Sequence, residues 1–534
     1  KAYLEFAFTP FPKDFQVREL KFQLTIKELQ SGRILLAERF KFAKRVLKFK
    51  TRRISLDDFI GKTIHLQFNL QTTPVLNSFP NAIIWDAPQI FSVAKPDTPN
   101  ILLISIDALR ADHLSCYGYQ RKTSPYIDKL AGQSYIFKHA FTTYGTTWPA
   151  LTSMMTSLYP SVHGVIENGY KLPQEFITLP EILHKNGYET AALLGNMKKA
   201  SHRGYGFLYR SKADDDLALN TLWTLEKYKA KKFFMWIHFW GTHEPYRAPD
   251  KYLKKFNLSP EDAILGYRKK HFELLKKYGS ISNVNLQKIT ALYDANIYYT
   301  DELVGRILRK LKKLHLDENT IIILTTDHGQ ELYQHRNYLY HAGSIYDAVL
   351  QIPLIIFIPH SNIINKYNGI EAQRLKGKMN KDTKKVFIDE FTSNIDIAPT
   401  LLNLLNIQVP TVFKGLNLVP VLEGKSLARD WIFSEAQGNV FSLRNNKWHY
   451  IYNYSQKPIT MLDYFVFDYS EELYRHPADI LELHNLVSEE SETTKKYHEF
   501  LINWAKKNLR FDVPAQALDA ETLEQLKALG YINP

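Results

Sequence analysis

Short, uninterrupted apolar runs recur along most of this chain, and they restrict its fold more than any other feature. The clearest run occupies residues 101–107 (ILLISID), and similar runs lie at 190–194, 233–239, 320–324 and 353–358. Strands that are apolar at every position are typical of a sheet buried on both faces. Segments with helical spacing separate the runs, so the pattern predicts an α/β domain whose mostly parallel sheet is flanked by helices.

The two ends of the chain show different patterns. Near the N-terminus, short segments such as TIHLQFNL at 63–70 alternate apolar and polar residues, and amphipathic helices are scarce. We therefore expect a β-sandwich at residues 1–95, the α/β domain at 96–425 and a small α+β subdomain at 426–534. The proline-containing linker AKPDTPN at 94–100 separates the first two regions.

Composition and charge exclude several classes of protein. The chain has 534 residues, and its hydrophobic fraction of 45% excludes a disordered protein. Its single cysteine, Cys116, excludes an intramolecular disulfide and a cysteine-rich zinc finger. The net charge of +13 suits an anionic substrate, an anionic lipid surface or nucleic acid. No nucleic-acid-binding motif occurs, and no apolar run reaches the ~18–20 residues of a membrane helix. We therefore expect no nucleic-acid partner and no membrane span.

Acidic side chains and a histidine follow two of the apolar runs. Asp107 ends the first run, and Asp327 and His328 follow the run at 320–324. In open α/β sheets, functional groups lie just beyond the carboxyl ends of the strands. Carboxylates with an adjacent imidazole suit one divalent metal ion such as Mn, Zn, Mg or Ca. Each aspartate taken alone would also fit a helix N-cap.

A third segment, GTTWPALTSMMTSLYP at 145–160, predicts a helix that begins near Thr147. Pro149 suits the first turn of a helix, because its missing N–H costs nothing there. The free backbone N–H groups from Trp148 onward form an anion site. A threonine hydroxyl becomes a nucleophile only when a metal or a base removes its proton, and Thr147 alone would otherwise be read as an N-cap.

Taken together, these segments resemble the sulfatase branch of the alkaline phosphatase superfamily. The resemblance covers residues 98–534 in family order and leaves the first 95 residues outside it. The stretches that carry it are PNILLISIDALRADHLSCYGY at 99–119, GTTWPALTSMMTSLYPSVHGV at 145–165, NGYETAALLGN at 186–196, FFMWIHFWGTHEPYRAP at 233–249, ILTTDHGQELYQH at 323–335, YHAGSIYDAVLQIPLIIFIP at 340–359, FTSNIDIAPTLLNLLNI at 391–407 and the closing LEQLKALGYI.

The resemblance implies a metal site and a nucleophile. Asp107, Asp327 and His328 fall on metal-ligand positions of the family. Thr147 falls on the nucleophile, which is itself a metal ligand through its oxygen. A single-metal site is implied, because the Asp-xxx-His pair of the two-zinc branches is not found between Thr147 and Asp327.

The resemblance also implies residues that contact the substrate. His243 and His341 fall where family members hold the substrate's oxyanion or protonate the leaving group, and Asn196 falls near the pocket. The helix N-terminus that begins at Trp148 would contact the equatorial oxygens. We interpret two further histidines, His238 and His335, as structural.

This chain departs from the family pattern at the nucleophile. Most sulfatases convert a cysteine or serine there into formylglycine, whereas Thr147 carries a methyl group on its β-carbon and cannot follow that route. The arginine that supports formylglycine is replaced by Leu151, and the second aspartate of the first strand is replaced by Ala108. Threonine at this position resembles the phosphoryl-transfer branches, which include nucleotide pyrophosphatase/phosphodiesterases, lipoteichoic acid synthases and phosphoethanolamine transferases.

We therefore predict a metal-dependent phosphoester hydrolase or phosphotransferase that forms a covalent phosphothreonine and favours phosphodiesters, with lipid- or glycan-linked esters among the substrates considered. Two alternatives stay open: a sulfuric ester hydrolase that acts without formylglycine, and a non-catalytic member that binds metal and glycan. We expect a periplasmic or extracellular protein. The chain opens at Lys1 with neither a methionine nor a signal segment, so a targeting or anchor segment could have been removed. No sequence feature indicates the oligomeric state.

Overall fold

The structure is a computed structural model of the chain. It forms two compact units, Lys1–Pro96 and Asp97–Pro534. The residues that the structure describes are 2–8, 19–29, 31, 33–43, 50–59, 62–73, 85–92, 98–195, 203–335, 337–359, 385–437, 440–461, 465–467 and 470–508.

The first unit consists of two three-stranded antiparallel sheets, with strand orders β4-β1-β6 and β3-β2-β5. Leu24 and Ile26 lie two residues apart on β2 and are fully buried, and Thr25 between them is buried as well, so burial does not alternate at this point of the strand. Packing of the two sheets as a sandwich stays a prediction. The elements are β1 (Ala2–Phe8), β2 (Glu19–Glu28), β3 (Ile34–Ala43), β4 (Lys50–Ser55), η1 (Asp57–Phe59), β5 (Ile64–Thr73) and β6 (Trp85–Ser92).

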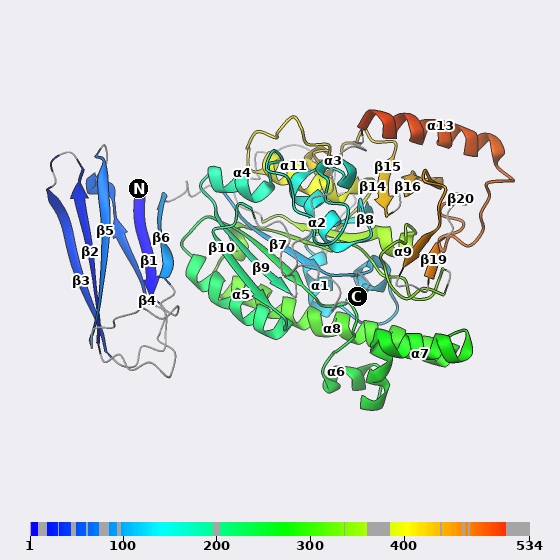
Figure 1. Ribbon diagram of the computed structural model, residues 1–534, viewed down its shortest axis with the longest axis horizontal. Helices are drawn as coiled ribbons and strands as arrows, with labels where there is room; N and C mark the ends of the chain where they lie inside the picture. Colours follow the sequence, from blue (N-terminus) through cyan, green and yellow to red (C-terminus); the bar gives the residue numbers. More distant parts are fainter. Residues whose placement is uncertain are drawn as a thin grey trace. The chain divides into compact units, whose positions relative to one another are not determined.

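The second unit is built on an eight-stranded sheet with the order β10-β9-β11-β7-β12-β13-β8-β14 (Figure 1). The strands are β7 (Asn100–Ile106), β8 (Tyr135–Phe141), β9 (Glu189–Gly195), β10 (Phe207–Ser211), β11 (Phe233–Phe239), β12 (Thr320–Thr325), β13 (Gln351–Phe357) and β14 (Val386–Ser393). All neighbouring pairs are parallel except those of β13, which runs antiparallel to β12 and β8. The expected mostly parallel sheet is confirmed, although an apolar run predicts burial without indicating strand direction.

Helices cover both faces of this sheet, which explains why its strands lack polar alternation (Figure 1). On β7, Leu102 and Ile104 belong to one apolar layer, and Ile101 and Leu103 belong to the other. The helices of the first layer are α1 (Pro125–Ala131), α5 (Asp214–Tyr228) and α8 (Asn283–Lys313). Those of the second layer are α2 (Thr147–Thr156), α4 (Leu179–Lys185) and α11 (Ile397–Leu404).

The C-terminal part of this unit forms a smaller antiparallel sheet with the order β15-β16-β17-β20. Helix α13 (Ser491–Asn508) packs on it, with the rings of Phe433 and Trp504 stacked 3.6 Å apart. The hydroxyl of Ser434 donates to the carbonyl oxygen of Thr142 at 2.7 Å and ties the small sheet to the large one. The strands are β15 (Ile432–Ala436), β16 (Val440–Arg444), β17 (Trp448–Asn453), β18 (Ile459–Met461), β19 (Phe465–Phe467) and β20 (Glu471–Arg475).

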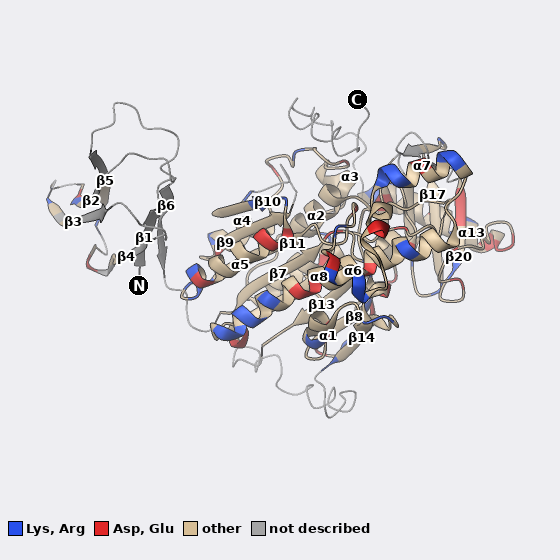
Figure 2. Ribbon diagram, turned by 90° about the horizontal axis from the view of Figure 1, so that it is seen from below, with Lys and Arg blue, Asp and Glu red and all other residues tan. Residues whose placement is uncertain are grey.

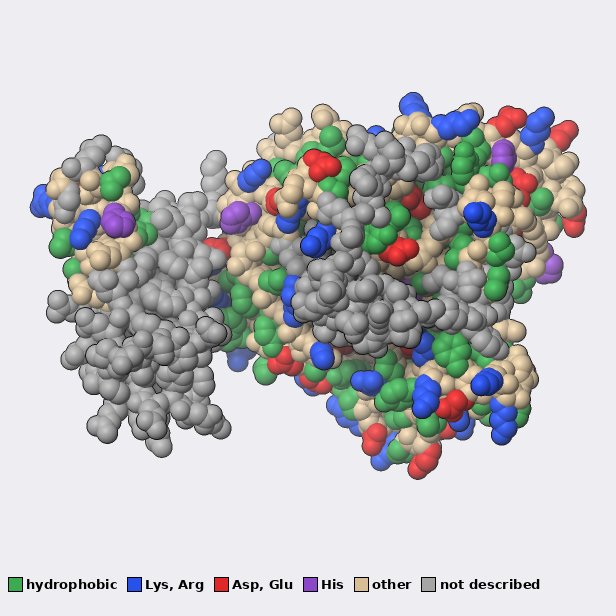
Figure 3. Space-filling view, viewed as in Figure 1, with side chains coloured by type: hydrophobic (Ala, Val, Ile, Leu, Met, Phe, Trp, Pro, Cys, Tyr) green, Lys and Arg blue, Asp and Glu red, His purple; other side chains and the backbone are tan. Residues whose placement is uncertain are grey.

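Short helices connect these elements. They are η2 (Ala111–His113), η3 (Ser115–Tyr117), α3 (Pro160–His163), α6 (Asp250–Lys255), η4 (Pro260–Gly266), α7 (Arg268–Tyr278), η5 (Asp317–Asn319), α9 (Asp347–Leu350), η7 (Asn394–Asp396) and α12 (Val419–Leu422). Charged side chains line α7 and α8 (Figure 2), and acidic and basic side chains are interspersed on the face seen in Figure 3. Within the described residues, no helix is both long enough and apolar enough to cross a membrane.

Candidate active site

Two aspartates lie close together where the central strands of the large sheet end. β7 and β12 are parallel neighbours, and Ser105 of β7 pairs with Thr325 of β12. Asp107 and Asp327 each come two residues after this pair, so both follow their strands at the same level of the sheet. Their side chains are buried, with 0% and 1% of the residue surface exposed. The register of the two strands therefore brings the carboxylates together at the carboxyl end of the sheet.

Local hydrogen bonds fix the orientation of the Asp327 carboxylate. Its Oδ1 accepts from the backbone N–H groups of Ala108 (3.2 Å) and His328 (3.0 Å) and from the hydroxyl of Thr326 (3.1 Å). Its Oδ2 has no hydrogen-bond partner in the described part of the chain and lies 3.4 Å from His328 Nε2. One oxygen is thus held in place and the other is directed into the site.

His328 and Thr147 complete this group of side chains. His328 Nδ1 donates to the carbonyl oxygen of Gly329 at 2.9 Å, which leaves a lone pair on Nε2. That Nε2 lies 3.3 Å from Thr147 Oγ1 and 3.8 Å from Asp107 Oδ1. Thr147 is the first residue of α2, with Thr146 as its N-cap residue. At Gly329 the chain passes so close to the carbonyl of Ala348 that a Cβ would collide with it.

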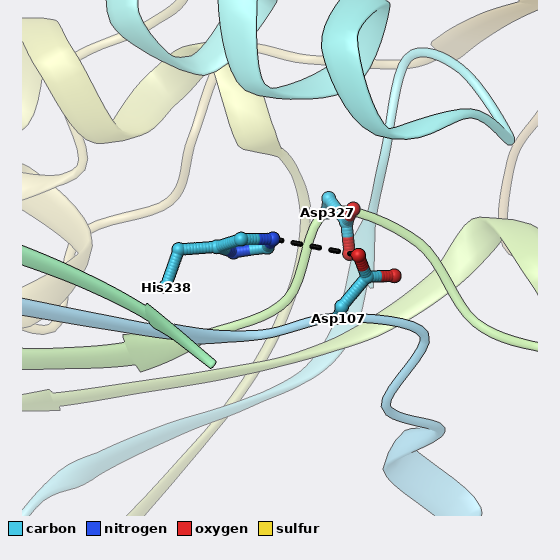
Figure 4. A group of neighbouring side chains, drawn as sticks. All are labelled: Asp107, His238 and Asp327. Carbon is cyan, nitrogen blue, oxygen red and sulfur yellow. Dashed lines mark ion pairs between the residues drawn. The ribbon is translucent and has the colours of Figure 1, made fainter. Parts of the chain in front are cut away.

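A third strand contributes a histidine that we interpreted as structural from the sequence. His238 of β11 is fully buried, and its Nε2 lies 3.5 Å from Asp107 Oδ2. Its Nδ1 lies 2.8 Å from the hydroxyl of Ser105. Asp107, His238 and Asp327 form a buried group whose ligand atoms all lie within 4.8 Å of one another, and Figure 4 shows the His238 ring pointing at the two carboxylates. The structural interpretation of His238 is therefore incomplete.

The electrostatics of this group are unfavourable without a cation. Burial, followed by repulsion from Asp327, raises the pKa of Asp107 to about 8. Burial also acts to raise the pKa of Asp327, but the neighbouring His328 and His238 and two backbone N–H groups lower it below its usual value. Burial lowers the pKa of His238, which keeps the imidazole neutral. Among the described residues, no lysine or arginine forms an ion pair with either aspartate.

The group fits a divalent cation. Four of its atoms are buried without a hydrogen-bond partner in the described ranges: Asp107 Oδ1 and Oδ2, Asp327 Oδ2 and His238 Nε2. Leaving a buried polar atom unsatisfied costs about 1–3 kcal/mol, and more for a charged group. One cation would pair with all four atoms and offset the repulsion between the carboxylates. We therefore identify this buried Asp/His group as the candidate metal site.

Two further histidines face each other beside this site. His341 Nδ1 donates to the carbonyl oxygen of Gly145 (2.9 Å), and His243 Nδ1 donates to that of Glu244 (2.6 Å). Their Nε2 atoms are 3.2 Å apart, which is hydrogen-bond distance when one of the two carries a proton. The ring of His341 stacks on that of His328 with centroids 4.0 Å apart.

Charged and histidine side chains surround this pair. Burial, together with the nearby His328 and His243, keeps the pKa of His341 well below its usual value. Glu244 lies on the other side of His243, with its Oε2 3.4 Å from Nδ1. Burial acts to raise the pKa of Glu244, but His243 and Arg268 lower it below its usual value. The pair therefore lies next to His328, with its two Nε2 atoms in contact.

The other residues that the sequence analysis singled out are Trp148, Asn196 and His335. The backbone N–H of Trp148 donates to the side-chain oxygen of Asn168 at 2.9 Å, and its indole is buried in the apolar layer above the sheet. Asn196 lies outside the described residues. His335 Nδ1 contacts Glu331 at 3.0 Å, and its Nε2 donates to the carbonyl oxygen of Leu481 at 2.8 Å, which is a structural role.

A second buried acidic group, which the sequence analysis did not single out, lies between α9 and the small sheet. It consists of Asp347, His449 and Glu482, whose ligand atoms also lie within 4.8 Å of one another. Arg444 lies within it, and its guanidinium donates to Asp347 Oδ2 at 2.8 Å and to Glu482 Oε1 at 2.9 Å. Burial raises the pKa of Asp347 to about 7 despite this arginine. Here the chain supplies its own cation.

A family profile and several curated relatives of this chain all point to the same family, the sulfatases. The profile of the family described as Sulfatase matches residues 99–407. The ulvan-active sulfatase of Formosa agariphila is 25% identical over 356 residues, which cover 62% of this chain and 66% of that protein. Arylsulfatase K of Bos taurus is 24% identical over 431 residues (67% and 74%), and human iduronate 2-sulfatase is 24% identical over 446 residues (68% and 79%).

Solved structures show the same fold. The phosphonate monoester hydrolase of Agrobacterium radiobacter superposes with a TM-score of 0.61 at 21% identity, covering 77% of this chain and 96% of that one. A structure solved in complex with its substrate D-glucosamine-2-N,6-O-disulfate superposes with a TM-score of 0.62 at 19% identity, covering 78% and 99%. The second unit therefore has the α/β fold of these hydrolases, with additional small antiparallel sheets.

Proposed function

This chain belongs to the sulfatase family and is a hydrolase that acts on ester bonds, and from this premise we propose that it is a phosphoester hydrolase or phosphotransferase whose nucleophile is Thr147. The observation that carries the proposal is the position of the Thr147 hydroxyl, 3.3 Å from His328 Nε2 at the start of α2. No cysteine or serine occupies that position, so the formylglycine route of most sulfatases is closed to this chain.

The site supports nucleophilic displacement at phosphorus. A divalent cation bound by Asp107, Asp327 and His328 supplies the charge that lowers the pKa of a nearby hydroxyl and polarises an ester oxygen. Thr147 Oγ1 loses its proton to solvent and attacks in line, the Oγ1–P bond forms and the bond from phosphorus to the leaving oxygen breaks. Water or an acceptor alcohol then takes the phosphoryl group from the threonine.

The His243–His341 pair supplies the proton that the leaving group needs. The pair holds one proton between two Nε2 atoms, next to His328 and therefore next to Thr147. Donation of that proton neutralises the departing alkoxide, and the pair recovers it from the water or alcohol that attacks in the second step.

Phosphodiesters are the substrate class that the charges favour. The site offers one candidate cation centre and one histidine pair, which suits a monoanionic diester better than a dianionic monoester. Lipid- or glycan-linked diesters at a periplasmic or extracellular location are the setting that we propose. Membership of a hydrolase family removes the reason to favour a non-catalytic binding protein.

A second candidate function is a sulfuric ester hydrolase that works without formylglycine. It is favoured by the relatives, whose names include an ulvan-active sulfatase, arylsulfatase K and iduronate 2-sulfatase. In that case Thr147 would contact the cation and a water molecule would attack sulfur. The two functions differ in whether a covalent intermediate forms on Thr147.

The experiment that separates them compares Thr147→Ala with the wild-type chain on three substrates. We expect wild-type protein to cleave bis(4-nitrophenyl) phosphate faster than 4-nitrophenyl phosphate or 4-nitrophenyl sulfate in the presence of Mn²⁺ or Zn²⁺. Thr147→Ala should lose about 10³-fold in kcat/KM, while Thr147→Ser, which keeps a hydroxyl, retains activity. Mass spectrometry of acid-quenched wild-type protein should detect phosphate on the peptide that contains Thr147.

The matched control is Thr152→Ala, which removes a buried threonine hydroxyl from the same helix without touching the site. It should leave kcat/KM within a few-fold of wild type. Diester cleavage that survives Thr147→Ala would remove threonine as the nucleophile. Turnover of the sulfate ester with both phosphates inert would establish the sulfatase alternative instead.

A further inference from the structure

The donor atoms at the candidate metal site do not come from the expected residues alone. Asp107, Asp327, His328 and Thr147 were the expected ligands, and Ala108, which follows Asp107, offers no side-chain ligand. The backbone N–H of Ala108 instead donates to Asp327 Oδ1 at 3.2 Å. His238 lies on β11, which borders β7 on the side away from β12, and its Nε2 is directed toward the carboxylates (Figure 4).

Hydrogen bonds on the far side of the His238 ring determine which nitrogen carries the proton. Ser105 pairs with His238 across β7 and β11, and its hydroxyl lies 2.8 Å from Nδ1. The same hydroxyl accepts from the indole N–H of Trp236 at 2.9 Å and lies 3.4 Å from the carbonyl oxygen of Ile237. If the hydroxyl donates to Ile237, it accepts from both Trp236 and His238 Nδ1–H. Every group is then satisfied, and a lone pair is left on Nε2.

Two pairs of donor atoms have a spacing close to that of direct coordination, and Asp107, His238 and Asp327 form the group whose ligand atoms all lie within 4.8 Å of one another. In a tetrahedral zinc site with bonds of about 2.0–2.1 Å, neighbouring donor atoms are about 3.3 Å apart. His238 Nε2 and Asp107 Oδ2 are 3.5 Å apart, and His328 Nε2 and Asp327 Oδ2 are 3.4 Å apart. A histidine with a purely structural role would be expected to use both nitrogens in hydrogen bonds. His238 Nε2 has none among the described residues.

We propose that His238 is a direct nitrogen ligand of the cation, oriented by the hydroxyl of Ser105, and that it makes the site selective for a borderline transition metal such as Zn²⁺ over Ca²⁺ or Mg²⁺. Two imidazoles and two carboxylates give the mixed nitrogen and oxygen ligands that suit Zn²⁺, whereas Ca²⁺ and Mg²⁺ prefer oxygen ligands alone. The proposal rests on the proposed function to the extent that a cation binds at Asp107, Asp327 and His328. It adds the fourth protein ligand and the class of metal.

The first test measures metal binding to the full chain after removal of bound metal, without reference to activity. Calorimetric titration with Zn²⁺ and Ca²⁺ should give stronger Zn²⁺ binding in wild type. His238→Gln should weaken Zn²⁺ binding by 100-fold or more, and Ser105→Ala, which frees the ring, should weaken it about 10–100-fold. His238→Asp, which offers oxygen in place of nitrogen, should shift the preference toward Ca²⁺.

The matched control for these variants is His271→Gln. His271 is a buried histidine whose two nitrogens contact Tyr340 and the carbonyl oxygen of Leu265, so its replacement changes a buried imidazole away from the site. Its Zn²⁺ affinity should equal that of wild type. Equal Zn²⁺ affinity of His238→Gln and wild type would overturn the proposal.

A second measurement uses the wild-type chain and so does not depend on whether a variant folds. X-ray absorption at the zinc edge of the Zn²⁺-loaded protein should show two imidazole ligands, and a count of one would overturn the role of His238. The Co²⁺-loaded protein should show visible bands that change in Ser105→Ala. If wild type bound no divalent metal at all, the metal part of the proposed function would fail as well. If it bound metal through one imidazole, only this proposal would fail.

Discussion

The molecule contains two buried groups of acids and histidines, and they balance their charge in different ways. Asp107 and Asp327 form no ion pair with a lysine or arginine in the described part of the chain, and three of their carboxylate oxygens are unpartnered. Asp347 and Glu482 hold the guanidinium of Arg444 between them. The first group is the candidate site for a cation, and the second contains the guanidinium of Arg444.

This difference separates a reactive site from a structural joint. Buried charges that are paired within the chain hold elements together, whereas buried charges left unpaired destabilise the fold until a ligand arrives. Asp347 begins α9 of the large domain, while Arg444 and His449 belong to adjacent strands of the small sheet. The second group therefore fastens the small sheet to the segment that follows His341.

The largest expected effect comes from removing one charge at the first group. Asp327→Asn should abolish tight binding of Zn²⁺ and reduce kcat/KM on the preferred ester by about 10³-fold, because the cation loses a charged ligand. Asp347→Asn removes a charge of the same type from the second group and should leave both quantities within a few-fold of wild type. Elemental analysis for metal and steady-state kinetics check both variants. If both variants lost Zn²⁺ binding and kcat/KM to the same extent, the proposed difference between the two groups would be wrong.

The second prediction removes the internal cation. Arg444→Met leaves Asp347 and Glu482 buried without their guanidinium partner, so we expect a loss of about 3–5 kcal/mol in the free energy of unfolding, measured by chemical denaturation. Adding Zn²⁺ should not restore it. Lys425→Met removes a cation whose pair with Glu423 is exposed and should cost at most about 1 kcal/mol.

A combined variant sharpens this prediction. Arg444→Met together with Asp347→Asn and Glu482→Gln removes the charges that Arg444→Met leaves behind. It should recover much of the lost stability, because uncharged amides are less costly to bury than carboxylates. Recovery of Arg444→Met by Zn²⁺ would mean that the second group is a metal site as well.

The sequence predicted those parts of the candidate site that follow from position along one strand. Asp107 and Asp327 were found because carboxyl ends of parallel strands meet at one edge of a sheet. His238 was missed because its importance depends on β11 lying beside β7, and the order β9-β11-β7-β12 is not the order along the chain. The available signal was a histidine inside an otherwise apolar strand, FFMWIHF, where burial demands a partner.

Other features were out of reach for a similar reason. The antiparallel direction of β13 left no trace in its apolar run, because burial on both faces erases alternation in either direction. The group around Arg444 is assembled from α9, β16, β17 and the loop at Glu482. These segments are separated by up to 135 residues, so no local pattern could join them.

The third prediction concerns the metal-free protein. The folded-state pKa of Asp107 is raised to about 8 from 3.8, so its protonated form is the favoured one in the fold. The protonated Asp107 carboxyl therefore contributes stability that is present below about pH 4 and is lost as the pH rises toward 8. We expect metal-free wild type to lose stability across this range and Asp107→Asn to be more stable than wild type at pH 8. Thermal unfolding checks both.

The smallest expected effect lies beside the second group. Burial opposes the charge of His335, but Glu331 and Glu482 raise its pKa to about 9, above the usual value of 6.5. A raised histidine pKa contributes stability that is fully present below about pH 6.5 and is lost as the pH rises through 9. Wild type should therefore lose on the order of 1 kcal/mol between pH 7 and pH 10, and His335→Gln should lose less. Because the cationic ring donates to Leu481 next to Glu482, the loss should appear with or without bound metal. A loss that Zn²⁺ suppressed would instead belong to the first group, and denaturant titrations at both pH values with and without Zn²⁺ distinguish the two.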